Sequence, residues 1–133
     1  MEHKKVRLKE FSDIVTARQA CREMARQLGF GSADQTRLAT AVSELARNVI
    51  QYAGAGECVV SDDSDGDEIR IRVVVEDHGP GIPDLGKAME PGFSTNAGLG
   101  AGLPGAKRLV HEFHAKSVPG HTIINVRLSR KRT

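Results

Sequence analysis

Glycine is concentrated in one short part of this 133-residue chain, and this limits what the chain can fold into. Eight of the 14 glycines lie in the segment 79–105. Ordering glycine costs conformational entropy, so this density requires unusual backbone angles or a ligand that approaches the backbone closely. The segment after Asp77 also has weak hydrophobic periodicity, and long loops in compact domains are usually lids or binding loops. We therefore expect a lid or binding loop after Asp77.

The rest of the sequence is typical of one soluble domain spanning residues 1–133. Hydrophobic residues make up 39% of the chain and charged residues 27%, which favours a packed core over disorder. The formal charge of +2 is too small to indicate nucleic-acid binding. No apolar run is long enough for a membrane span, and the charged start lacks the apolar segment of a signal peptide. Cys21 and Cys58 have no metal or redox spacing, so we expect reduced thiols and a cytoplasmic location. From the small net charge and the short apolar runs we expect no nucleic-acid or membrane partner.

Hydrophobic periodicity predicts an alternation of strands and helices. A short strand is expected at Val6, Leu8 and Phe11, and the basic end, Arg127 with residues 130–132, is interpreted as a solvated tail. The acidic segment 62–68 lacks the spacing and the terminal glutamate of an EF-hand loop, so we interpret it as a turn. The remaining predicted elements are helices over 13–29, 32–52 and 103–113 and strands over 57–61, 69–77 and 123–128.

The first candidate site residues are Glu44 and Asn48, on the second predicted helix. They are four positions apart, so their side chains lie on the same helical face. The helical period places them at one margin of the apolar stripe that runs from Ala41 to Ile50, so both side chains should be half-buried. Taken alone, such a pair is more often a polar helix flank than a catalytic pair.

Asp77, Gly79 and Gly81 follow the most apolar predicted strand. A carboxylate at the end of a buried strand needs a hydrogen-bond donor, and an exocyclic amino group on a base would be a suitable one. The two glycines would let a flat ring approach the backbone. In isolation, the same segment is equally compatible with a simple Gly-Pro turn.

A glycine-rich segment, Gly98-Leu-Gly100-Ala-Gly102-Leu-Pro-Gly105, leads into the third predicted helix. Backbone N–H groups of such a loop and of a helix N-terminus favour phosphate. A Walker A loop is excluded, because Lys107 comes one residue late and is followed by Arg108. A dinucleotide fingerprint is excluded, because the segment follows a loop rather than a strand and no acidic residue lies near position 125.

In order along the chain, Glu44-x-x-x-Asn48, Asp77-x-Gly79-x-Gly81 and Gly98-x-Gly100-x-Gly102 resemble the three sequence boxes of the GHKL (Bergerat-fold) ATP-binding superfamily. The segments 44–54, 77–83, 92–95 and 98–108 look like those of the switch serine/threonine kinases associated with bacterial stressosomes. This resemblance covers nearly the whole chain. It implies a two-layer α/β sandwich, in which helices cover one face of a mixed sheet and a mobile lid closes over ATP.

The resemblance also implies a role for each candidate residue. Glu44 would be the catalytic general base, Asn48 would offer its amide oxygen to Mg²⁺, and Asp77 would accept a hydrogen bond from adenine. Thr122 would support adenine, although His121 stands directly before it where the family usually has glycine. The residues implied in ATP binding are Asn48, Asp77, Gly79, Gly81, Ile82, Gly98, Leu99, Gly100, Ala101, Gly102, Leu103 and Thr122.

The implied function is an ATP-dependent serine/threonine kinase that phosphorylates a STAS-domain partner in a bacterial stress-signalling switch. Phosphorylation would add negative charge to the interface and release the kinase, which would then activate an effector such as a PP2C-type phosphatase. An alternative is an anti-sigma factor kinase, which shares the three boxes, sequesters a sigma factor and phosphorylates its antagonist. A detached histidine-kinase catalytic domain is a third reading, but it would need a dimerising helix with a phospho-accepting histidine, which this sequence does not show.

Overall fold

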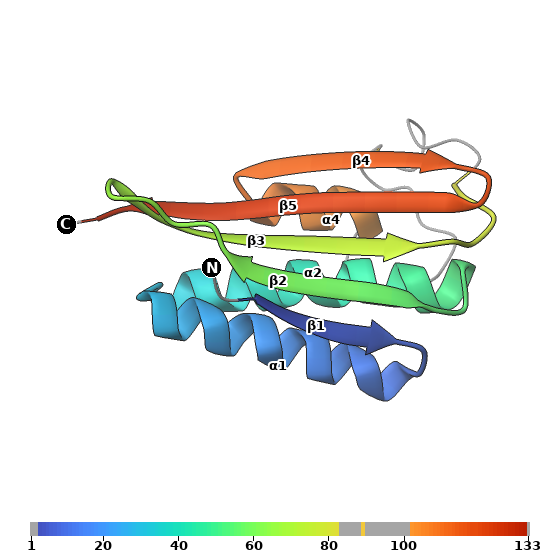
Figure 1. The fold of residues 1–133 in the computed structure, drawn as a ribbon, viewed down its shortest axis with the longest axis horizontal. Helices are drawn as coiled ribbons and strands as arrows, with labels where there is room; N and C mark the ends of the chain where they lie inside the picture. Colours follow the sequence, from blue (N-terminus) through green and yellow to red (C-terminus); the bar gives the residue numbers. More distant parts are fainter. Residues whose placement is uncertain (1–2, 83–88, 90–101, 133) are drawn as a thin grey trace.

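Strands and helices form two layers in the computed structural model, which describes residues 3–82, 89 and 102–132 (Figure 1). The described helices lie on one face of the sheet and leave the other face open. In chain order, the elements are β1 (His3–Leu8), α1 (Phe11–Leu28), α2 (Ser32–Tyr52), β2 (Gly56–Asp62), β3 (Glu68–Asp77), α4 (Gly102–Leu109), β4 (Glu112–Val118) and β5 (His121–Lys131).

The sheet has the strand order β1-β2-β3-β5-β4, and every neighbouring pair of these strands is antiparallel. Two helices between β1 and β2 return the chain to the end of the sheet at which β1 stops, and turns join β2 to β3 and β4 to β5. The predicted two-layer sandwich with helices on one face is confirmed. The resemblance implies a mixed sheet, but every neighbouring pair of described strands is antiparallel. Strands β3 and β4 run in the same direction, but β5 lies between them.

Local sequence explains where α1 begins and ends. Glu10 and Asp13 form a capping box, in which each side chain accepts a hydrogen bond from the backbone of the other. Gly29 ends the helix with a φ of 103°, which glycine adopts without strain. The helices predicted over 13–29 and 32–52 are confirmed. None of the helices in the described ranges combines the length and apolar character that crossing a bilayer demands.

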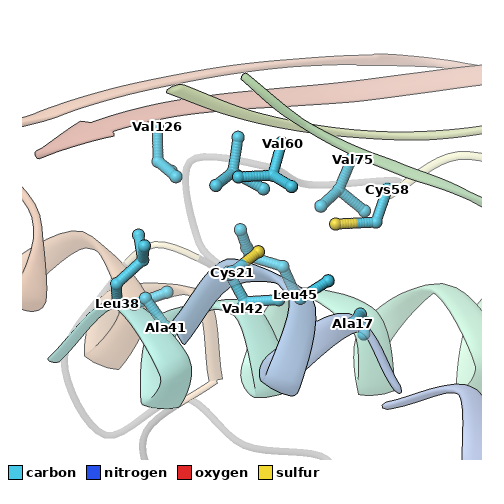
Figure 2. Packing of buried hydrophobic residues seen from close by; sticks show 14 of the residues in the cluster. Ala17, Cys21, Leu38, Ala41, Val42, Leu45, Cys58, Val60, Val75 and Val126 are labelled. Carbon is cyan, nitrogen blue, oxygen red and sulfur yellow. The ribbon is translucent and has the colours of Figure 1, made fainter. Parts of the chain in front are cut away.

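The core fills the space between the sheet and the helices, as Figure 2 shows. Strand side chains alternate between this core and the open face, so residues 71, 73 and 75 of β3 are buried while their neighbours are half-buried. The apolar stripe of α2 also points into the core, as predicted from its period. Its fully or almost fully buried members are Ala41, Val42, Leu45, Ala46 and Val49.

Cys21 on α1 and Cys58 on β2 lie opposite each other in this core (Figure 2). Both thiols are free, as expected from the sequence. The hydrogen bond with Cys58, and burial after it, raises the pKa of the Cys21 thiol well above its ordinary value. Cys21 therefore stays protonated and acts as a small apolar side chain.

The predicted helix over 103–113 is wrong in its last part. Helix α4 ends at Leu109, and residues 112–118 form β4 at the edge of the sheet. Phe113 and Ala115 point toward the core, and β4 pairs along its length with β5. Pairing with β5 therefore decides the structure of a segment whose apolar residues also fit a helical period.

Both ends of the chain also correct the prediction. The basic end is not a solvated tail, because β5 continues to Lys131 and its arginines form ion pairs. Arg127 contacts Asp63 at 3.3 Å and Glu112 at 3.2 Å. Phe11 does not extend the first strand, because the capping box at Glu10 starts α1 there and leaves the ring 68% exposed.

A buried carboxylate attaches the last strand to α2. Asp34, in the first turn of α2, accepts hydrogen bonds from Arg130 Nε at 2.6 Å and from Arg130 Nη2 at 2.8 Å. Arg37 Nη1 donates to the same carboxylate at 2.8 Å. The Arg130 hydrogen bonds, and the Arg37 bond after them, hold the pKa of Asp34 below its ordinary value of 3.8.

We expect Asp34→Asn to lower the free energy of unfolding at pH 7 by roughly 1–2 kcal/mol, since charged hydrogen bonds are lost but solvent screens Arg130. The folded pKa of Asp34 lies below its unfolded value, so its contribution is present above about pH 5 and disappears as the pH falls through the lowered pKa. Urea titrations between pH 7 and pH 3 measure both the loss and its pH dependence.

The control is Asp67→Asn, which changes an exposed aspartate in the turn between β2 and β3. It should leave the unfolding free energy nearly unchanged. Equal losses in the two variants, or a difference that does not shrink as the pH falls, would contradict the role assigned to Asp34.

Candidate active site

Helix α2 presents Glu44 and Asn48 at the margin of its buried stripe, as the sequence predicts. Glu44 is only 9% exposed, and Asn48 is half-buried. Arg47 Nη1 donates to Glu44 Oε1 at 3.0 Å, so one carboxylate oxygen is fixed by a neighbour on the same helix. Within the described part of the chain, Glu44 Oε2 and the Asn48 amide make no hydrogen bond, so both are available to a ligand.

Asp77 is the last residue of β3, and its side chain points toward the helical layer. It is only 6% exposed. The Gly79 backbone N–H donates to Asp77 Oδ1 at 2.9 Å, which offsets part of the cost of burying the carboxylate. The register places Asp77 between Gly56 of β2 and Thr122 of β5. Thr122 is also buried, so a carboxylate and a hydroxyl lie side by side at this end of the sheet.

The glycines around Asp77 are required by packing inside the protein. A Cβ at Gly79 would come within 2.5 Å of the Ala53 Cβ, at the end of α2. Gly81 has a φ of 87°, and a Cβ there would lie 2.7 Å from the Val118 carbonyl oxygen. The sequence interpretation assigned these glycines to the approach of a flat ring. The structure supplies a sufficient reason for both of them within the chain itself.

Two hydrogen bonds hold the turn after Asp77 against the β4–β5 hairpin, and a third fixes the hairpin side chain that accepts one of them. The Gly120 N–H donates to the Gly79 carbonyl oxygen at 2.9 Å. The Ile82 N–H donates to Ser117 Oγ at 2.8 Å, and Ser117 Oγ lies 2.6 Å from Thr122 Oγ1. Ser117 is a site residue that the sequence analysis missed. The alternation of Phe113, Ala115 and Ser117 along a strand was the signal that could have found it.

Packing brings the first two sequence boxes together. Val49 follows Asn48 on α2, and its Cγ1 lies beside the Gly56 α-carbon, which the Asp77 Cβ also approaches. One turn later, Ala53 packs against Gly79. The last two turns of α2 therefore lie beside the end of β3, and Asn48 and Asp77 line the same region.

Only the last part of the third box, from Gly102 on, lies within the described residues. Gly102 begins α4 with a φ of 60°, and Leu103 is buried in the core where α4 packs against α2. The start of α4 therefore lies on the same helical layer as Glu44 and Asn48. The predicted ligands Gly98, Leu99, Gly100 and Ala101 lie outside the described residues.

His121 does not block Thr122. Successive residues of β5 point to opposite faces, so Thr122 faces the helical layer while His121 faces the open side of the sheet. There the His121 Nε2 contacts Glu76 Oε2, and its ring stacks on that of His78 with centroids 5.3 Å apart. The departure from the family pattern at position 121 therefore leaves the position of Thr122 intact.

The arrangement has the chemistry of a nucleotide site. A buried carboxylate with one oxygen already bonded to Gly79, next to a hydroxyl, suits an amino group on a flat ring. An amide oxygen beside a carboxylate suits Mg²⁺, which takes few protein ligands together with phosphates and water. A carboxylate with one free oxygen suits proton abstraction.

Comparison with known proteins identifies the family by sequence. Residues 9–128 match the family model described as the histidine kinase-like ATPase domain. The chain is 53% identical over 115 residues to the serine/threonine-protein kinase RsbT of Bacillus subtilis (strain 168), and this match covers 86% of each protein.

Solved structures with low sequence identity share the fold. The RsbU and RsbW domains of a Mycobacterium tuberculosis protein match 98% of this chain with a TM-score of 0.69 at 19% identity, although this chain spans only 33% of that one. The SiaB–SiaC complex from Pseudomonas aeruginosa matches with a TM-score of 0.58 at 14% identity, covering 98% of this chain and 90% of the other. A mycobacterial sensor histidine kinase, MprB, gives 0.55 at 20% identity, with coverages of 98% and 99%.

These structural matches establish the fold, and the sequence matches extend over most of the chain. The boxes around Glu44, Asp77 and Gly102 stand where the fold brings α2, β3 and α4 together. The chain therefore belongs to the GHKL family of histidine kinase-like ATPases.

Proposed function

We propose that this chain is an ATP-dependent serine/threonine kinase that phosphorylates a STAS-domain protein in a partner-switching module. The observation that carries the proposal is the 53% identity to a serine/threonine-protein kinase over 86% of both chains. The arrangement of Glu44, Asn48 and Asp77 at one end of the helical layer supports it, because these side chains suit base, metal and purine chemistry in the same region.

Asp77 and Thr122 would recognise adenine. Asp77 Oδ1 is occupied by the Gly79 N–H, so the other oxygen is left to accept from the exocyclic amino group. Ser117 holds the Thr122 hydroxyl beside it, and the hydrogen bond from Ile82 fixes Ser117 in turn. Gly79, Gly81 and Ile82 would form the wall against which the base rests. Gly98, Leu99, Gly100, Ala101, Gly102 and Leu103 would surround the phosphates.

Glu44 would act as the general base for the substrate hydroxyl. Arg47 holds Oε1 and thereby orients the carboxylate, which leaves Oε2 to accept the proton from serine or threonine. Burial of Glu44 restricts its rotamers and excludes water from one side of it. Arg47 is therefore a positioning residue in this reaction.

Asn48 would hold Mg²⁺ through its amide oxygen, one helical turn from Glu44. The half-buried amide has no hydrogen bond to another described residue, so its oxygen fits this role. When bound, the ion would neutralise charge on the phosphates during transfer.

Partner switching would follow from charge. A phosphate on the STAS-domain protein adds negative charge at the interface and weakens its hold on the kinase. The released kinase would bind an effector, such as a PP2C-type phosphatase, in the cytoplasm.

The test of the proposed function is incubation with radiolabelled ATP, Mg²⁺ and each STAS-domain protein encoded nearby, followed by mapping of the labelled residue. Label on a serine or threonine supports the proposal, and the absence of label on every one of them contradicts it.

We expect Asp77→Asn to weaken ATP binding by about 100-fold or more. The new amide can turn an N–H toward the adenine amino group, so an acceptor is lost and two donors meet. Isothermal titration calorimetry at millimolar Mg²⁺ measures the affinity. Glu76→Gln is the matched control, because Glu76 precedes Asp77 but faces the open side of the sheet. Unchanged affinity in Asp77→Asn would remove Asp77 from the adenine site.

We expect Glu44→Gln to lower the rate of phosphoryl transfer by about 100-fold or more while ATP affinity changes little. The amide keeps an acceptor for Arg47 but no longer takes a proton. Single-turnover transfer with saturating ATP and substrate measures the chemical step. Glu23→Gln, an exposed change on α1, is the control. A rate equal to that of the wild type would exclude Glu44 as the base.

A further inference from the structure

The open face of the sheet has a groove at the end where β3 stops. The groove has a volume of about 700 Å³ and lies next to the connection between α2 and β2. Lys5 and Arg7 project into it from β1, Glu57 from β2, and His78 from the turn after β3. Ala53, Ala55 and Gly56 complete the wall.

The open face of the sheet carries more cationic side chains than carboxylates. The carboxylates at this end of the face already have partners, since Lys5 pairs with Glu57 and the His121 ring contacts Glu76. Arg7 has no carboxylate within ion-pair distance in the described part of the chain. Hydrogen bonds from the Glu10 and Lys9 backbone N–H groups lower the pKa of the Asp13 carboxyl group, and the charge of Arg7 also lowers it, but by less.

The excess of positive charge continues across the sheet. Arg72 of β3 bonds only to the Asn125 side chain, at 3.2 Å, and Lys116 of β4 has no partner among the described residues. Glu112, on the same strand as Lys116, is paired with Arg127. Among the described residues, the open face therefore offers unpaired cations at Arg7, Arg72 and Lys116. The glutamates on this face already contact a lysine, an arginine or a histidine.

Apolar side chains lie between these cations. Val59 of β2 and Val74 of β3 are register partners on the open face, and Ile123 of β5 lies one row away. All three are only half-buried, because no described element covers them. A surface of this kind suits a protein segment that carries both carboxylates and apolar side chains.

We propose that the groove docks an acidic segment of the protein that this kinase phosphorylates, and this inference rests on the proposed function. Arg7 is the central contact, because it is the groove cation that has no carboxylate within ion-pair distance among the described residues. A second copy of the chain is a poorer occupant. Packing two open faces together would bring Arg7, Arg72 and Lys116 of one copy close to the same cations of the other, and like charges repel.

The groove is separate from the transfer chemistry. Glu44 and Asp77 face the helical layer, whereas the groove opens on the opposite face of the sheet. It nevertheless lies at the same end as Asp77, because Arg7 pairs in register with Glu57, next to the Gly56–Asp77 pair. A partner that spans this end of the sheet would reach both faces. Loss of docking should therefore change substrate affinity without changing nucleotide affinity.

The test is the kinetics of Arg7→Glu with the STAS-domain protein that accepts label in the assay described above. We expect KM for this protein to rise by about tenfold or more at low salt, with kcat and the ATP dissociation constant within about twofold of wild type. We also expect the wild-type KM to rise with ionic strength and that of the variant to be nearly flat. Arg7 is exposed, and circular dichroism verifies that the variant is folded.

Arg18→Glu is the matched control, because Arg18 is an exposed arginine without an ion partner in the described residues and lies on α1, away from the groove. It should leave KM unchanged.

A KM increase in Arg18→Glu alone would place docking on α1 and overturn the inference. Unchanged KM in Arg7→Glu, or only a shift in its monomer–dimer equilibrium, would also overturn it. A wild-type chain that labels no STAS-domain protein would overturn the proposed function and the groove together, whereas normal labelling with unchanged KM rejects the groove alone.

Discussion

The close contact between the end of α2 and the turn after β3 is the constraint on which the candidate site depends. Gly79 sits against Ala53 at a separation that leaves no room for a Cβ. From the other side, the Gly120 N–H and the Ser117 hydroxyl hold the same turn. The turn is therefore fixed between a helix and a hairpin, and Asp77 is fixed with it. A side chain at position 79 would separate the two boxes by moving either the turn or the helix.

Sequence reasoning located the elements that depend mainly on local pattern. Helix α2 has a regular apolar stripe from Ala41 to Ile50, so its helical period was unambiguous, and its bounds were predicted well. Strand β4 was missed because it lies at the sheet edge, where only Phe113, Ala115 and Ser117 point inward and the partner strand β5 supplies the stability. A single sequence does not contain that pairing. The ion pair between Asp34 and Arg130 was invisible for the same reason, since 96 positions separate the two residues.

The candidate site was predicted to a similar extent. Glu44, Asn48 and Asp77 could be selected as candidates because spacing on a helix and position after a buried strand are local properties; their roles stay a prediction. Arg47 and Ser117 were not found, because their roles consist of contacts with Glu44 and with Ile82. The glycines show the limit most clearly: their positions indicated a close approach, but the sequence could not say whether a ligand or the chain itself makes it. At Gly79 and Gly81, the chain does.

The alternation of β3 explains how one turn can serve two surfaces. Glu76 points to the open face and Asp77 to the helical layer, while His78 in the turn that follows lines the groove. The stacked rings of His78 and His121 and the contact of His121 with Glu76 tie the groove wall to β5, directly beside Thr122. Gly79 in turn packs against Ala53, at the end of the helix that carries Glu44 and Asn48. One short turn therefore places a groove residue on the open face directly after a carboxylate on the helical side. The groove and the candidate site lie at the same end of the sheet because they share this turn, while their side chains point to opposite faces.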